Sequence, residues 1–265
     1  MKNRQKMLAV LLLLIFILLV NGYKNSAKGQ SRNPQDHTEI GNISATAGEH
    51  DDVGRKERET ADIDMAKKTK AIEETRLPLS IELDVREIYQ RPELPTGCES
   101  VALTMLLVYE GYDLDKTTIA RHYLIYSETG DLDAGYVGDP FTESGAGCFP
   151  STIVKTAERY LEEQKSDLAA VDLTGKDMEK LLHYVADGHP VAVWTTVDME
   201  LPHLIEEENS EVAWYNTEHC VVISGYDLER KTLTIQDPME GPVKRDIEVF
   251  GNIYNSIGQY AVVLL

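Results

Sequence analysis

Cys98 is the residue in this sequence best placed to act as a nucleophile. It follows the turn-forming residues Pro95 and Gly97 and begins an apolar segment with helical spacing that extends to Tyr109. A cysteine attacks only as the thiolate, and the free backbone N–H groups and dipole of a first helical turn favour negative charge. The competing interpretation is a small buried residue that begins a core helix. Cys98 therefore needs a base nearby to count as catalytic.

A predicted β-hairpin near the C-terminus supplies that base. The apolar runs His219–Tyr226 and Thr232–Asp237 flank the polar turn Asp227–Lys231. A register centred on Leu228 places His219 directly opposite Asp237 on one face, with Cβ atoms about 4.5–5.5 Å apart. This pairing requires a loop with an odd number of residues, because a slip of one residue moves a side chain to the other face. A carboxylate that holds an imidazole fixes its tautomer, so Cys98, His219 and Asp237 indicate a cysteine hydrolase.

The remaining elements define how these residues are held. Apolar residues at helical spacing predict helices, at Cys98–Tyr109, Asp115–Tyr123, Ser151–Gln164 and Lys176–Ala186. Strands are expected at Leu83–Tyr89, at Val191–Thr196 and in the hairpin. A glycine-rich loop between Gly130 and Pro150 has the length of a functional loop. Because helices come first and strands last, we expect an α+β fold with N-terminal helices packed on a C-terminal antiparallel sheet.

The net negative charge of the chain limits the kinds of macromolecule that it can bind. The 265-residue chain has a formal net charge of −19, and residues 76–265 hold fourteen basic and thirty-four acidic side chains. Such a domain repels phosphate backbones, so nucleic acid is not an expected partner. Cationic peptides or proteins would be attracted to it, although an acidic surface can also serve solubility alone.

The N-terminal third predicts a targeting or anchoring segment followed by a linker. Three basic residues precede the uncharged apolar run Met7–Val20, which predicts that residues 1–22 are a signal peptide or an N-terminal membrane anchor. Either outcome places the rest of the chain outside the cytoplasmic membrane. Residues 23–77 are too polar to bury a core and are expected to form a disordered polar linker, with the catalytic domain at 78–265.

Three stretches together resemble a known family, and they are Tyr89–Leu107, Glu218–Asp227 and Ile235–Pro238. They are similar to the papain-like cysteine peptidase domain related to double-glycine leader peptidases of bacteriocin exporters, and closest to its stand-alone secreted or membrane-attached branch in Gram-positive bacteria. The resemblance implies a papain-like fold with Cys98 as nucleophile, His219 as general base and Asp237 as its orienting acid. It also implies that Gln90 supplies the side chain of the oxyanion hole. The exporters' ATP-binding cassette and membrane domain have no match, so leader cleavage during export is not implied.

The other candidate ligands and thiols point to no second site. Cys148 and Cys220 have no base at a suitable position, and a disulfide between them stays open, with Cys98 as the free thiol. His183, His189 and His203 lack the spacing of metal ligands, so neither a metal nor a cofactor is expected.

These observations predict an extracytoplasmic cysteine peptidase, a thiol hydrolase that cleaves peptide bonds in peptide or protein substrates, cationic ones included. The N-terminal segment is its only expected contact with a membrane, and a monomer is expected. Two alternatives remain: a catalytically silent papain-like binding module, and an amidase or transpeptidase that acts on cell-wall peptides. The full set of Cys98, His219, Asp237 and Gln90 favours an enzyme, because a silent module has no need to keep it.

Overall fold

A single antiparallel sheet organises the part of the chain that the structure describes. The computed structural model describes residues 76–205, 214–215 and 217–265. The sheet has seven strands in the order β2-β9-β3-β6-β7-β8, and β1 pairs with β6 beyond the end of β3. Its strands are β1 (Ser80–Glu82), β2 (Ala170–Asp172), β3 (Val191–Thr196), β6 (Glu218–Asp227), β7 (Thr232–Asp237), β8 (Gly241–Asp246) and β9 (Ala261–Leu264). A separate two-stranded ladder joins β4 (Leu204–Ile205) to β5 (Trp214–Tyr215).

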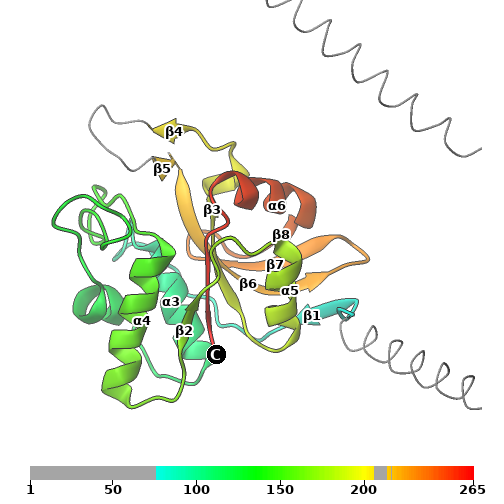
Figure 1. Ribbon diagram of the computed structural model, residues 1–265, viewed down its shortest axis with the longest axis horizontal. Coiled ribbons are helices and arrows are strands. Elements are labelled where there is room, and N and C mark those ends of the chain that lie inside the picture. The colour runs from blue at the N-terminus through cyan, green and yellow to red at the C-terminus, as the bar shows by residue number, and fades with distance from the viewer. Residues whose placement is uncertain (1–75, 206–213, 216) are drawn as a thin grey trace, which may run out of the picture. The chain divides into compact units, whose positions relative to one another are not determined.

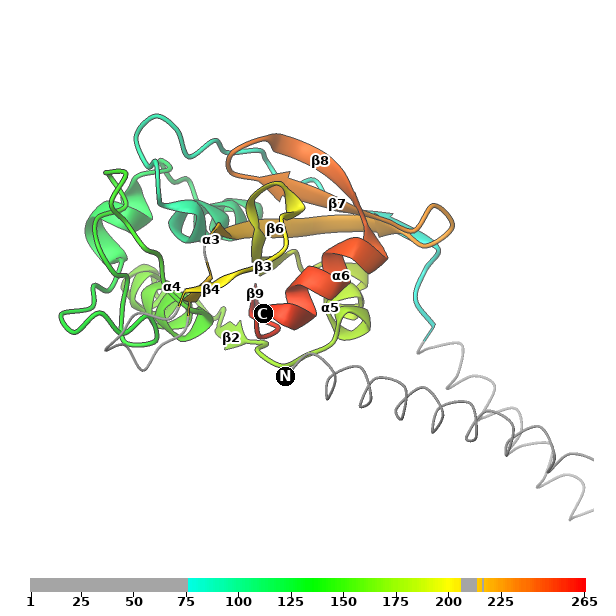
Figure 2. The same ribbon diagram turned by 90° about the horizontal axis from the view of Figure 1, so that it is seen from above.

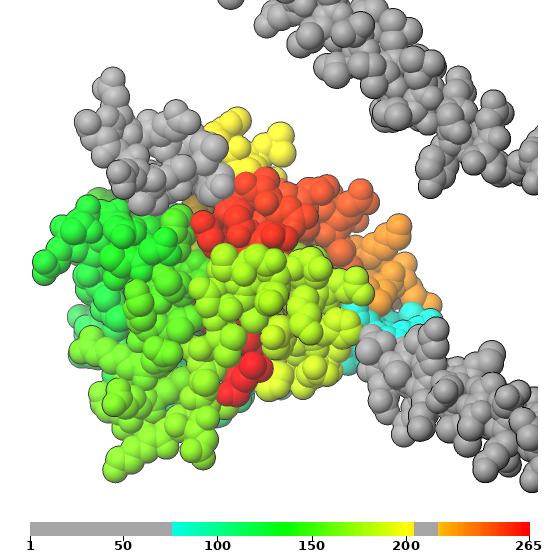
Figure 3. Space-filling model, viewed as in Figure 1, coloured from blue at the N-terminus to red at the C-terminus, as the bar shows by residue number. Residues whose placement is uncertain are grey.

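Helices cover both faces of the sheet (Figure 1). The helices are α3 (Cys98–Tyr109), α4 (Pro150–Gln164), α5 (Met178–Ala186) and α6 (Ile247–Ser256), with short turns η1 (Ile119–Tyr123) and η2 (Val197–Met199). Helices α3 and α4 pack on one face and α5 and α6 on the other, as the view from above also shows (Figure 2). In the space-filling view, α5 and α6 lie side by side at the surface (Figure 3). The described domain is thus a three-layer sandwich of helices, sheet and helices.

Alternation along the strands divides the interior into two cores. In β3 and β6, Ala192, Trp194, Cys220 and Val222 face α3 and α4. The residues between them face α5 and α6, and they are Val191, Val193, Val221 and Ile223. Both faces are apolar because successive side chains of a strand point to opposite sides and each side carries a helical layer. Such two-sided burial explains why β3 and β6 appear in the sequence as continuous apolar runs.

Most of the predicted elements are confirmed, and the α+β fold with them. Helices α3, α4 and α5 and strands β3, β6 and β7 form where apolar periodicity placed them. The expected strand at Leu83–Tyr89 is wrong, because the strand lies earlier and ends at Glu82, and the segment after it runs as a loop toward the site. Of the expected helix Asp115–Tyr123, only the π-helical turn η1 forms its regular part. Helix α6 was not predicted, although Asp246 caps it by accepting hydrogen bonds from the N–H groups of Glu248 and Val249, both 2.9 Å long.

The hairpin of β6 and β7 forms, but its register differs from the predicted one. The pair Asp227 and Thr232 closes the turn, so the loop between them has an even number of residues. Continued without interruption, that register would put Asp237 on the face away from His219. A β-bulge at Ser224 shifts the register by one residue, and Val222 then pairs with Gln236. His219 and Asp237 consequently share a face as diagonal neighbours, not as directly opposed residues.

Trp194 connects the sheet to the loop in front of α4, and its replacement should destabilise the domain. Its side chain is fully buried, and its indole Nε1 donates a 2.9 Å hydrogen bond to the Cys148 carbonyl. A Trp194→Phe variant loses this bond and leaves a cavity, so we expect the free energy of unfolding to fall by about 2–3 kcal/mol. Urea unfolding followed by circular dichroism measures the change. A loss below about 0.5 kcal/mol, the size of an ordinary surface effect, would contradict it.

Several predictions concern residues that the structure does not describe. The signal peptide or anchor at 1–22 and nearly all of the linker at 23–77 lie outside the described residues, so those boundaries stay predictions. None of the described helices has the length and apolar character needed to cross a bilayer.

Candidate active site

Cys98 is the first residue of α3 and lines a cavity. A tight turn leads into the helix, in which the Gly97 N–H donates to the Leu94 carbonyl over 3.2 Å. A side chain at Gly97 would lie 3.0 Å from Leu94 Cβ, so the close approach favours glycine there. Cys98 is 6% exposed, and its exposed edge faces a cavity of about 270 Å³. The sulfur is therefore accessible only through that cavity.

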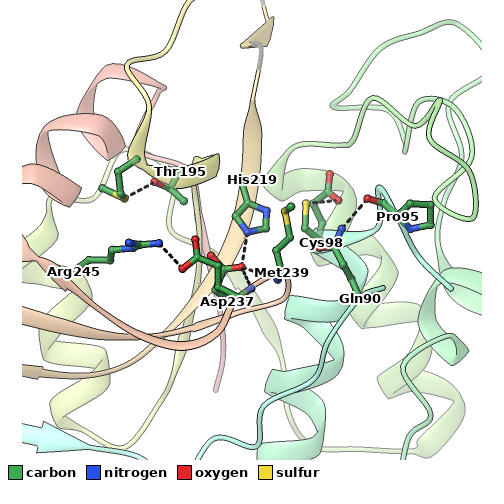
Figure 4. Close-up of polar contacts among 11 residues, drawn as sticks. Gln90, Pro95, Cys98, Thr195, His219, Asp237, Met239 and Arg245 are labelled. Atoms are coloured by element: carbon green, nitrogen blue, oxygen red, sulfur yellow. Dashed lines mark hydrogen bonds and ion pairs between the residues drawn. The ribbon is translucent and has the colours of Figure 1, made fainter. Parts of the chain in front are cut away.

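His219 and Asp237 are brought together as the sequence predicted. His219 Nε2 and Asp237 Oδ1 are 2.8 Å apart, and both residues are buried (Figure 4). Burial acts to raise the pKa of Asp237, but the hydrogen bond and charge of His219 outweigh it and lower that pKa. The Asp237 carboxylate also accepts the N–H groups of Met239 and Glu240, over 2.7 and 3.2 Å. With Nε2 engaged by Asp237, His219 has Nδ1 left for the cavity, which it lines together with Cys98.

Gln90 is fixed next to this pair. Its backbone N–H donates to the carbonyl of Pro238 over 2.8 Å, so the segment before α3 is attached to the residue that follows Asp237. The side-chain Nε2 donates to the Pro95 carbonyl over 2.9 Å, in the turn that leads to Cys98. The side chain is buried and lines the same cavity. The two hydrogens of Nε2 allow one to hold the turn while the other points at a developing negative charge.

The glycine-rich loop forms the opposite wall of the cavity. Tyr136 donates a 2.5 Å hydrogen bond from its hydroxyl to the Thr96 carbonyl, and Thr96 Oγ1 donates to the Thr142 carbonyl over 2.9 Å. A Cβ at Gly145 would overlap both the Thr96 Oγ1 and Tyr136 hydroxyl oxygens, so only glycine fits between them. The functional role expected of this loop is consistent with its position, because Glu143, Gly145, Ala146 and Gly147 line the cavity.

Two carboxylates beside the nucleophile were missed by the sequence analysis. The Cys98 thiol donates a 3.3 Å hydrogen bond to Glu99 Oε2, and Glu99 Oε1 accepts the N–H of Cys148 over 2.7 Å. Glu218 is the first residue of β6, directly before His219. One oxygen of each carboxylate and the Cys98 sulfur all lie within 4.8 Å of one another. A signal was present, because an acidic residue is adjacent in sequence to the candidate nucleophile and to the candidate base, as Cys98-Glu99 and Glu218-His219.

These carboxylates change the expected ionisation of Cys98. Burial raises the pKa of the Cys98 thiol well above its ordinary value, and the charges of Glu99 and Glu218 raise it further. The helix N-terminus was expected to lower that pKa. Its dipole is outweighed here because the sulfur is enclosed and faces two acidic groups.

The three cysteines, all among the described residues, form no disulfide. Cys98, Cys148 and Cys220 are all free and buried, so the Cys148–Cys220 disulfide left open by the sequence is not formed. The Cys98 sulfur and one oxygen each of Glu99 and Glu218 lie close enough together to coordinate a metal ion. Both Glu99 oxygens already accept hydrogen bonds, one from the Cys98 thiol and one from the Cys148 N–H.

A papain-like cysteine peptidase fold is the class that this architecture defines, with a helix that begins at a cysteine packed against an antiparallel sheet that carries the histidine. The family model described as Peptidase_C39 like family matches residues 82–262, and this chain belongs to that family.

Individual known proteins are similar to this chain over much of its length. The uncharacterized protein YvpB of Bacillus subtilis strain 168 is 31% identical over 183 residues, which are 65% of this chain and 70% of YvpB. A crystal structure of a candidate C39-like peptidase from Bacillus anthracis is 31% identical and covers 70% of this chain and 97% of its own, with a TM-score of 0.61. A double glycine motif protease from an AMS/PCAT transporter, solved with its leader peptide, matches at 18% identity and a TM-score of 0.39, over 69% of this chain and 91% of its own.

Proposed function

We propose that this protein is a cysteine peptidase that hydrolyses peptide bonds with Cys98, His219 and Asp237. The observation that carries the proposal is the 2.8 Å contact between His219 and Asp237 at the wall of a cavity that Cys98 and Gln90 also line. The hairpin of β6 and β7 supplies His219 and Asp237, and α3, which lies far away in sequence, supplies Cys98. Membership of a peptidase family supports the same reaction class.

The reaction proceeds as acyl transfer. Cys98 gives its proton to His219, and the sulfur attacks the carbonyl carbon of the scissile bond. The negative charge that develops on the carbonyl oxygen is met by the Cys98 N–H, at the first turn of α3, and by Gln90 Nε2. His219 then gives its proton to the leaving amine, and water hydrolyses the thioester with His219 as base. Asp237 keeps the imidazole in the required tautomer and stabilises its charged form throughout.

One observation favours a silent binding module as the second candidate. The Cys98 thiol is held by Glu99 and its pKa is raised, which is unfavourable for a nucleophile at rest. We regard the peptidase as the better proposal because it is supported by the His219–Asp237 contact and by a cavity that His219, Gln90 and Cys98 all line. Cell-wall peptides remain among the substrates to be tested, since amide hydrolysis and transpeptidation use the same groups.

We further propose that the peptidase acts outside the cytoplasmic membrane on peptides that carry positive charge. The basic and apolar pattern of residues 1–22 supports the location. Acidic side chains at the cavity, Glu143 and Glu218, and the net negative charge of the domain support the preference for cations.

A peptide-library digest tests the reaction and its specificity together. Purified protein is incubated with peptides of random sequence and with cell-wall stem peptides, and new termini are identified by mass spectrometry. The Cys98→Ala variant is the blank. Cleavage that requires Cys98, enriched next to Lys or Arg, is the expected result, and cleavage that the blank reproduces would exclude the assignment.

Gln90 should contribute to the rate without contributing much to stability. We expect Gln90→Ala to lower kcat by about 10²–10³, because removal of one oxyanion donor has that effect in other hydrolases. KM should change little, since the lost interaction forms only in the transition state. Steady-state kinetics on the best library peptide measures both constants, and Gln164→Ala, at the far end of α4, is the matched control. A change confined to KM would assign Gln90 to substrate binding instead.

A further inference from the structure

Glu99 and Glu218 lie close enough to the Cys98 sulfur for their charges to control its ionisation. Glu99 is fully buried, and its two oxygens are occupied by the Cys98 thiol at 3.3 Å and the Cys148 N–H at 2.7 Å. Glu218 is partly exposed at the cavity, while its Oε1 is enclosed and has no hydrogen-bond partner among the described residues. Gly147 keeps both carboxylates close, because a Cβ there would lie 2.6 Å from Glu99 Oε1 and 3.0 Å from Glu218 Oε2.

Two carboxylates so close together and so poorly solvated cannot easily carry two charges. Aspartic-protease dyads show the consequence, which is that such a pair keeps one proton between its members. In agreement, burial and the neighbouring Glu99 raise the pKa of Glu218 well above its ordinary value, and burial raises the pKa of Glu99. A pair that holds one proton still carries one negative charge next to the sulfur.

We propose that Glu99 and Glu218 form a proton-sharing pair that holds Cys98 as a neutral thiol and lets it ionise when the pair is neutralised. In the resting state the thiol donates to the Glu99 carboxylate, and a thiolate would face a negative charge across 4.8 Å or less. When a further proton enters the pair, that repulsion disappears. The thiol proton then passes to His219, which gives a thiolate and an imidazolium with no other bond made or broken. The proposal rests on the proposed function in taking Cys98 as the nucleophile.

The direction in which pH changes the activity follows from the groups that surround the Glu99–Glu218 pair. Titratable groups that interact with the pair are Cys98 on α3, His219 and Cys220 on β6, and Tyr136 and Cys148 on the glycine-rich loop. Arg91 and Glu143 line the same cavity, and Asp237 on β7 is hydrogen-bonded to His219. Of these groups, only His219 and Arg91 can be cationic. As pH rises, the pair loses its shared proton and disfavours the thiolate more strongly, so peptidase activity should fall on the alkaline side.

The test follows the alkylation of Cys98 by iodoacetamide, read from its peptide by mass spectrometry, between about pH 4 and about pH 10. Glu218→Gln and Glu99→Gln keep the side-chain shape and remove the charge, and the amide oxygen introduced by Glu99→Gln can still accept the Cys148 N–H. We expect the midpoint of labelling to move to lower pH in both variants. A shift of one pH unit corresponds to roughly tenfold faster labelling at neutral pH. Glu162→Gln, which removes an exposed carboxylate of α4 outside the cavity, is the control and should keep the wild-type profile.

Infrared spectroscopy of the wild-type protein gives a second test that does not require any variant to fold. The wild-type protein at neutral pH should show the carbonyl stretch of a protonated carboxylic acid, and this band should weaken in Glu218→Gln. Unchanged midpoints, a midpoint that moves upward in Glu99→Gln, no labelling of Cys98 at any pH, or no carboxylic-acid band would each overturn the proposal. Failure of the proposed peptidase function can be distinguished from failure of the proton-sharing proposal, because labelling of Cys98 needs no substrate. A shifted midpoint without peptide cleavage would leave the proton-sharing pair intact and remove the peptidase.

Discussion

Replacing Cys98 by alanine should abolish peptide hydrolysis while leaving the fold intact. Alanine removes the only atom that can attack the carbonyl, and loss of a nucleophile costs on the order of 10⁴–10⁶ in kcat. The helix should persist, because alanine is the residue that most favours a helix and Cys98 is its first residue. Initial rates on a peptide from the library digest measure the loss, and circular dichroism establishes that the variant is folded.

Cys148→Ala is the matched control for this experiment. Cys148 is also a free, buried cysteine, and it contacts Glu99 through its backbone N–H, which alanine retains. We therefore expect near wild-type kcat from this variant, with a modest loss of stability from the small cavity. Equal activity of Cys98→Ala and wild type would remove Cys98 from the mechanism, and equal loss in both cysteine variants would indicate a structural effect.

Replacing Asp237 by alanine should lower kcat by about 10³–10⁴. Its carboxylate holds His219 Nε2 at 2.8 Å, and loss of the orienting acid from related triads lowers kcat by about 10⁴. KM should change less, since Asp237 does not line the cavity. Kinetics together with nitrogen NMR of the histidine ring measures the rate and the tautomer in the same samples.

Asp237→Asn separates position from charge. Asparagine Oδ1 can still accept the Nε2 hydrogen and the N–H groups of Met239 and Glu240, so we expect the tautomer and the turn to be kept. It cannot neutralise the imidazolium, so its kcat should lie between those of alanine and aspartate. An asparagine variant as slow as the alanine variant would show that charge, and not orientation, is the main contribution of Asp237.

Local pattern was sufficient for most of the scaffold. The helix that begins at Cys98 and the strands that carry His219 and Asp237 were predicted because each is rich in apolar residues and has clear boundary residues. Leu83–Tyr89 failed for the opposite reason, because its loose alternation belongs to a loop whose position depends on contacts with β6 and Pro238. Alternation predicts that a segment can be a strand, but partner strands decide whether it becomes one.

The catalytic pair shows where sequence reasoning depends on tertiary structure. His219 and Asp237 were predicted to be neighbours, but through an odd loop and direct opposition. The structure reaches the same contact through an even loop and a bulge at Ser224. A bulge leaves almost no trace in the sequence pattern, because the strand is buried on both faces and nearly every position is buried in either register.

By itself, the sequence determined the chemical inventory: a cysteine at a helix start, a histidine and an aspartate on successive strands, and a glutamine before the helix. The placement of the cysteine, histidine and aspartate follows from short-range physics, in which capping, periodicity and turn chemistry act within a few residues, whereas the role of the glutamine was implied by the family resemblance. Only the tertiary structure decided the surroundings of the nucleophile. Glu99 and Glu218 lie more than a hundred positions apart in the chain, and packing of α3 against β6 places both beside the Cys98 sulfur. Because burial and charge act through space, the ionisation of Cys98 could not be read from its neighbours in sequence.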